Sequence, residues 1–94
     1  MLSKEITCLA QAYFHQDYDL EYDSPIQALV DYREVHDEKT VSALREALQD
    51  LIDSGISEEE LAALWLEEGL ASYDPRADGI SMSDWFRKMV DVLT

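Results

Sequence analysis

The chain has 94 residues, with 21 acidic against seven basic side chains and a formal net charge of −14. This length and the hydrophobic fraction of 47% predict one small domain over residues 1–94, whose core needs neither a metal nor a disulfide. The single cysteine excludes an internal disulfide, and no apolar run approaches the roughly 18 residues that a membrane span needs.

The negative charge is concentrated in two stretches that contain no Lys or Arg. Six acids lie between Lys4 and Arg33, and nine lie between Arg45 and Arg76. Such a surface repels phosphate, which disfavours direct binding of nucleic acid, and it attracts cations or a basic protein. Acidity that only keeps the protein soluble is the alternative. With one cysteine and no signal-peptide pattern, we expect a cytoplasmic protein that does not bind membranes.

A first helix is predicted over residues 3–13, with Ser3 as its N-cap. Its apolar stripe consists of Leu2, Ile6, Leu9, Ala10 and Tyr13. Residues 13–22, which we call the aromatic–acidic stretch, hold four of the nine aromatic residues, interleaved with three carboxylates. We interpret this stretch as an irregular helix end and a connector, with aromatics anchored to the core and acids in water. A short extended piece over residues 18–22 is the alternative.

Ser24 and Pro25 predict the start of a second helix that runs to about Val35. Apolar residues lie on two of its sides, so we expect it to pack between two neighbours rather than to expose a patch. The two sides are Ile26, Leu29 and Val30, and Ala28, Tyr32 and Val35. After a polar connector over residues 36–39, Thr40 is expected to cap a third helix that ends at Gly55.

Ser57 and Glu60 form a capping-box pattern that opens a fourth helix. Glu68 falls on the core stripe of this helix, so we expect the helix to fray before Gly69; a buried partner such as Arg76 or His15 is the alternative. Residues 73–79 are a turn cluster, and a last helix follows from residue 81. Five short helices without a strand predict an all-α fold, a compact single-domain bundle.

The turn cluster partly matches a calcium-binding loop that begins at Asp74. Asp78 and Gly79 fit its fifth and sixth positions, but Arg76 and Trp85 cannot serve as ligands at the third and twelfth. We therefore expect a turn held by an ion pair between Arg76 and local carboxylates. A small calcium- or metal-responsive interaction module that uses Asp74 and Asp78 is the alternative function.

No arrangement of side chains in the sequence indicates catalysis. The two histidines lack a metal-ligand spacing, and a hydrolase built on His15 and Asp17 would need a cleft and a nucleophile. We interpret His15 as a hydrogen-bonded imidazole that ties the connector to the first helix. Cys8 has only Lys4 as a nearby cation and is expected to be inert. We predict no catalytic residue, no metal site and no cofactor.

Two segments and the residues between them carry a family pattern. The segments are Tyr13-Phe14-His15-Gln16-Asp17-Tyr18-Asp19-Leu20 followed by Ser24-Pro25, and Tyr73-Asp74-Pro75-Arg76-Ala77-Asp78-Gly79 with the downstream Trp85. With residues 55–61, they resemble a family of small bacterial immunity proteins of contact-dependent growth inhibition systems. We interpret eight motif positions as structural: Tyr13, Phe14, His15, Asp74, Arg76, Asp78, Gly79 and Trp85.

The resemblance implies a non-enzymatic antitoxin that binds the C-terminal toxin domain delivered by a neighbouring cell. Such a protein blocks the active site or the substrate surface of the toxin, and many of these toxins are basic nucleases that act on RNA. The net charge agrees, because an acidic surface can occupy a groove built for phosphate. We expect the toxin-binding face to consist of Asp17, Asp19, Glu21, Asp23, Glu58, Glu59, Glu67 and Glu68.

Overall fold

The structure, a computed structural model, describes residues 3–94 except for the side chains of Tyr18 and Asp19, and Leu2 therefore lies outside it. The elements are α1 (Lys4–Tyr13), α2 (Tyr18–Glu21), α3 (Pro25–Val35), α4 (Glu38–Asp53), α5 (Glu58–Ala62), the π-helix η1 (Ala63–Glu68), the 3₁₀-helix η2 (Pro75–Asp78) and α6 (Met82–Leu93). No strand occurs within residues 3–94. The predicted all-α fold and its five helices are confirmed, the fourth helix corresponding to α5 with η1.

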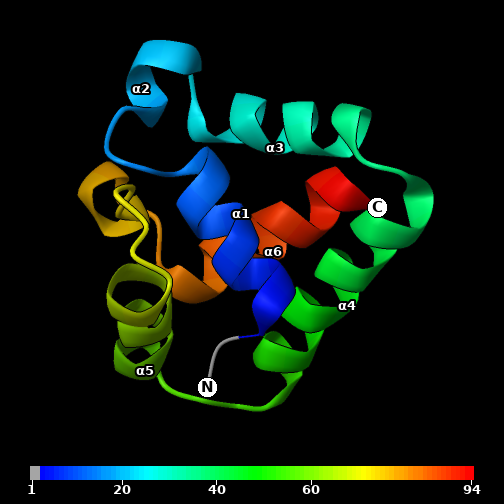
Figure 1. The fold of residues 1–94 in the computed structure, drawn as a ribbon. Helices are drawn as coiled ribbons and strands as arrows, with labels where there is room; N and C mark the ends of the chain where they lie inside the picture. Colours follow the sequence, from blue (N-terminus) through cyan, green and yellow to red (C-terminus); the bar gives the residue numbers. More distant parts are fainter. Residues whose placement is uncertain (1–2) are drawn as a thin grey trace.

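Helix α6 is the central element of the bundle. It packs against α4, α3 and α5, and α1 crosses in front of it in Figure 1. Its buried side chains recur with the helical period, as expected for a face turned toward a core. They are Met82, Trp85, Phe86, Met89 and Leu93. On its exposed side, Arg87 lies 3.4 Å from Asp84 rather than pairing with Asp91.

Side-chain caps set where the helices begin. Ser3, Ser24, Ser57 and Ser81 each accept the backbone N–H three residues further on, at 3.1 to 3.3 Å, as the sequence predicts. The predicted cap at Thr40 is wrong. Asp37 accepts the Thr40 N–H at 2.8 Å, so α4 begins at Glu38 and the polar connector over residues 36–39 does not exist as such. Asp caps a helix as well as Thr does, and it stands earlier in the chain.

Helix α3 contacts α1, α4 and α6, as expected of a helix with apolar residues on two sides. Ala28, Leu29 and Tyr32 are buried, but Val35 is 66% exposed, so its predicted place on a core-facing side is wrong. Val35 is the last residue of α3, and His36 after it is extended. Val35 therefore lies at the exposed end of α3, where the chain turns away into an extended conformation.

The aromatic–acidic stretch is tied to a distant part of the chain. Phe14 is fully buried, and its carbonyl accepts the Ser72 N–H at 2.7 Å. Beyond it, Tyr18–Glu21 form the one-turn helix α2, so the alternative of an extended piece over residues 18–22 is wrong. The aromatic–acidic stretch therefore crosses the surface as a bend followed by a single helical turn.

The fourth predicted helix changes its hydrogen-bond pattern before it ends. After α5 it widens into η1, where the Gly69 N–H donates to the Leu64 carbonyl at 2.9 Å, five residues back. The extra residue in this turn moves Glu68 off the core stripe, and Glu68 is exposed. The expected fraying is therefore wrong, and no ion pair joins Glu68 to Arg76 or His15 in the described part of the chain.

Candidate functional site

The two motif segments meet in one aromatic cluster. Phe14 from the end of α1 stands edge to face against Trp65 and Trp85, with ring centroids 5.3 and 5.7 Å away. Tyr73 lies 4.9 Å from Trp85, and its carbonyl accepts the Trp65 indole N–H at 2.9 Å. These rings are buried, so the cluster holds two segments onto the core: the aromatic–acidic stretch and residues 70–79, which we call the 70s loop. The cluster leaves no site open to a ligand.

The turn over residues 74–79 is held by its own polar side chains. The Asp74 carboxylate accepts two hydrogen bonds from the Arg76 guanidinium, at 2.9 and 2.8 Å, which keeps the pKa of Asp74 below its usual range. Asp78 accepts the Tyr73 hydroxyl at 3.0 Å, and Gly79 supplies a φ of 76°. The predicted ion pair at Arg76 is confirmed. No group of three His, Cys, Asp or Glu within the described residues is arranged to hold a metal ion.

His15 holds the connector to α2 rather than to the first helix, which corrects the sequence interpretation. Its Nδ1 accepts the Asp17 N–H at 3.1 Å, and its Nε2 lies 3.6 Å from a Glu21 carboxylate oxygen. Both contacts are within the connector and α2. They link Asp17 and Glu21, two residues of the expected toxin-binding face, through one imidazole.

The first group of expected binding acids surrounds α2. Asp17, Glu21 and Asp23 are exposed, whereas the side chain of Asp19 lies outside the described residues. Leu20 stands among them with 82% of its surface exposed, a feature that the sequence analysis did not single out.

Tyr22 anchors the end of this acidic segment to α3. Its hydroxyl donates to Asp31 at 2.8 Å, and its ring stacks on Tyr13 with centroids 6.3 Å apart. Burial, together with this hydrogen bond, raises the pKa of Tyr22 to about 12. The acids around α2 are therefore carried on a segment whose two ends, at Phe14 and Tyr22, are fixed to the core.

The second group of expected binding acids lies on α5 and η1. Glu59, Glu67 and Glu68 are exposed, but Glu58 is already engaged. Its two carboxylate oxygens accept the Met82 and Ser83 N–H groups at 2.7 and 2.9 Å, so it caps α6. In Figure 1, α2, the loop with η2 and α5 follow one another along one side of the molecule.

Leu70 is a second exposed apolar residue next to these acids. It lies two residues after the end of η1, is 63% exposed and has a φ of 58°, a left-handed conformation that is unfavourable for leucine. The sequence offers no signal for this conformation of Leu70. The backbone there is set by the preceding π-turn and by the Ala71 N–H, which donates to the Trp65 carbonyl at 3.2 Å.

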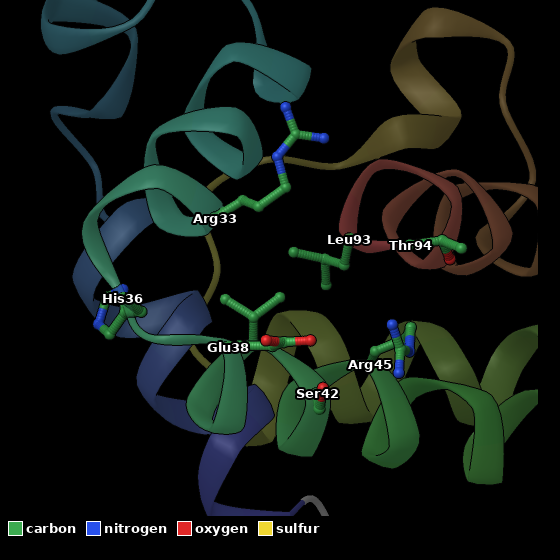
Figure 2. Close-up of a pocket in the computed structure, with 8 residues that line it drawn as sticks. Arg33, His36, Glu38, Ser42, Arg45, Leu93 and Thr94 are labelled. Atoms are coloured by element: carbon green, nitrogen blue, oxygen red, sulfur yellow. The ribbon is translucent and has the colours of Figure 1, made fainter.

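Basic side chains gather at a different place, where α3, α4 and the end of α6 meet. A hollow there is lined by Arg33, His36, Glu38, Arg45 and the last residues of α6 (Figure 2). Arg33 donates to the Val92 carbonyl at 2.8 Å, which satisfies an acceptor in the last turn of α6. A cation is also favourable at the negative end of the helix dipole. This contact gives Arg33 a structural role.

Two of the three comparisons with known proteins find a match. A family model described as "CdiI immunity protein" matches residues 3–93. A search of the curated proteins finds no match. One chain of the crystal structure of the CdiA-CT/CdiI complex from Y. kristensenii 33638 superposes with a TM-score of 0.90, at 17% sequence identity, and the match covers 96% of each chain. This likeness shows a common fold.

None of the helices within residues 3–94 combines the length and apolarity required to cross a membrane.

Proposed function

The chain belongs to the CdiI immunity protein family, and we propose that it binds and neutralises the toxin domain of its own contact-dependent growth inhibition system without catalysing a reaction. The family match over residues 3–93 is the observation that carries this proposal. The similar solved chain comes from a complex of CdiA-CT with CdiI, which supports a CdiA-type toxin domain as the partner.

We propose further that the toxin domain is a basic nuclease that acts on RNA. The net charge of −14 supports this, because a strongly acidic protein is attracted to a surface that binds phosphate. Covering such a surface would exclude the nucleic acid by charge as well as by volume. The neutraliser has to meet the toxin inside the cell, so we place it in the cytoplasm, where its lone cysteine stays reduced.

The proposed binding face combines the acids around α2 with those on α5 and η1. Asp17, Glu21 and Asp23 are exposed on a connector that is fixed at both ends, so little order has to be gained on binding. Glu59, Glu67 and Glu68 are exposed, and the helix α5 lies on the same side of the molecule as α2 in Figure 1. Leu20 and Leu70 offer apolar contacts beside these two groups. Asp19 and Glu58 complete the proposed set.

Charge reversal tests the proposal. In a variant with Glu21→Lys and Asp23→Lys, we expect association with the toxin domain to slow by at least about tenfold at low salt, and much less at high salt. The matched control carries Glu34→Lys and Glu46→Lys, exposed positions outside the proposed face with the same change in charge. Stopped-flow association rates measured against the purified toxin domain give the comparison.

Two results would speak against the proposal in different ways. Absence of any complex between the unmodified chain and the toxin domain of its system would refute neutralisation itself. If both double variants slowed association equally, only the net charge would matter, and the acids around α2 would be removed from the binding face.

A further inference from the structure

A groove with an apolar floor runs between the end of α4 and the α5–η1 segment. Its free volume is about 450 Å³. We call it the α4–η1 groove. Its floor consists of Leu51, Ile56, Ala63 and Leu64, and its polar lining residues are Ser54, Glu60 and Glu68. The four floor residues are only half-buried, although three of them pack against the core. The fold therefore leaves apolar surface uncovered at the bottom of this groove.

The two charged residues on the rim of the α4–η1 groove, Glu60 and Glu68, are both acidic. Glu60 and Glu68 have neither a hydrogen-bond nor an ion-pair partner for their carboxylates within the described residues. The groove also lies inside the sequence segment between Arg45 and Arg76 that contains no Lys or Arg. None of the described residues that line the groove carries a positive charge.

The π-turn brings the second carboxylate to the groove. With regular α-helical spacing, Glu68 would point into the core along with Leu61, Leu64 and Trp65. Because η1 closes its bond from Gly69 to Leu64 over five residues, Glu68 is displaced outward and lines the groove together with Leu64. Turns of this kind are rare in proteins, and those that occur are often found at functional sites.

We propose that the α4–η1 groove receives a long cationic side chain, an arginine or a lysine, from the toxin domain. An apolar floor beneath a negative rim matches a side chain whose aliphatic stem is buried while its charged end remains among polar groups. Carboxylates form strong charge-assisted hydrogen bonds with such a head group. This inference rests on the proposed function and adds to it a short-range anchor, distinct from the long-range attraction of the acidic face.

Binding kinetics with the purified toxin domain separate the anchor from general attraction. One variant carries Glu60→Gln and Glu68→Gln. Its matched control carries Glu34→Gln and Glu46→Gln, which remove the same charge from exposed positions outside both the groove and the proposed binding face. We expect the groove variant to dissociate about tenfold faster. The control should change only the association rate, and only at low salt.

A third variant, Ala63→Arg, places a guanidinium on the floor of the groove, where it can pair with Glu60 or Glu68. We expect it to compete with the toxin side chain and to weaken binding about tenfold, with an unchanged or higher melting temperature. The melting temperatures of all three variants show that they remain folded.

The outcomes distinguish this inference from the proposed function. If the groove pair and its control dissociate at equal rates, or if Ala63→Arg binds as tightly as the unmodified chain, the groove holds no anchor, although neutralisation stands. If the unmodified chain forms no complex with the toxin domain, both the proposed function and the anchor are refuted.

Discussion

Trp65 and Trp85 lie 6.0 Å apart in the core, but only Trp65 uses its indole nitrogen in a hydrogen bond. Trp65 donates to the Tyr73 carbonyl at 2.9 Å. The Trp85 N–H is buried without an acceptor in the described part of the chain, and aromatic rings stand edge-on around it. The two residues thus match in size and burial and differ in one polar contact.

This difference predicts unequal costs for the same substitution. Both Trp65→Phe and Trp85→Phe remove ring volume from the core, but only Trp65→Phe removes a buried hydrogen bond. We expect Trp65→Phe to lower the free energy of unfolding by about 1 kcal/mol more than Trp85→Phe does. Urea unfolding followed by circular dichroism measures both values. A larger loss for Trp85→Phe would show that the indole bond is not what holds the 70s loop.

At the scale of the helices, the start of α6 depends on a contact from another element. The Ser81 hydroxyl accepts the Asp84 N–H, and the Ser81 carbonyl accepts the Trp85 N–H. The two remaining N–H groups of the first turn, on Met82 and Ser83, donate to Glu58. All four donors are therefore satisfied, and the negative charge lies at the positive end of the helix.

Glu58→Gln is expected to weaken the fold in a way that depends on pH. Hydrogen bonds from Ser83 and Met82 lower the pKa of Glu58, so its contribution is present above the usual glutamate pKa and is lost as pH falls through the lowered value. At pH ~7 we expect a loss of about 1 kcal/mol in unfolding free energy. The gap to the unmodified chain should be narrower at pH ~3, below the usual glutamate pKa.

The control for this prediction is Glu59→Gln, which is exposed on the same helix and is not engaged with α6. We expect it to change stability by less than about 0.5 kcal/mol at either pH. Thermal melts at the two pH values measure the difference. Equal losses for both variants at pH ~7 would mean that Glu58 acts only through its charge on α5.

The sequence predicts the helices well because their start signals are local. Ser24 with Pro25, and Ser81 with Asp84, place helix starts correctly from neighbouring residues alone. The start of α4 was misplaced because Asp37 and Thr40 are both good caps three residues apart. No local signal in the sequence predicts the π-turn over Ala63–Glu68.

The candidate binding surfaces were less predictable than the helices. Exposure of acids such as Asp17 and Glu67 follows from charge alone, and the structure agrees. The capping role of Glu58 and the α4–η1 groove depend on contacts between elements far apart in the sequence, and no local pattern reports them.

For the molecule as a whole, the two groups of acids and the hollow with Arg33 and Arg45 lie on different elements. The segments α2, the loop with η2, and α5 follow one another along one side in Figure 1, and Arg33, Arg45 and Glu38 line the hollow beside the end of α6 (Figure 2). A partner with a cationic surface is therefore attracted in a preferred orientation. Orientation of this kind accelerates association more than it lengthens the life of the complex.

The most direct measurement is the association rate of the unmodified chain with its toxin domain as the salt concentration is raised. Between about 50 and 500 mM NaCl, screening shortens the reach of exposed charges to a few ångströms. We predict that the association rate falls by at least about tenfold over this range, while the dissociation rate changes little. An association rate that stays constant with salt would contradict neutralisation by an acidic surface.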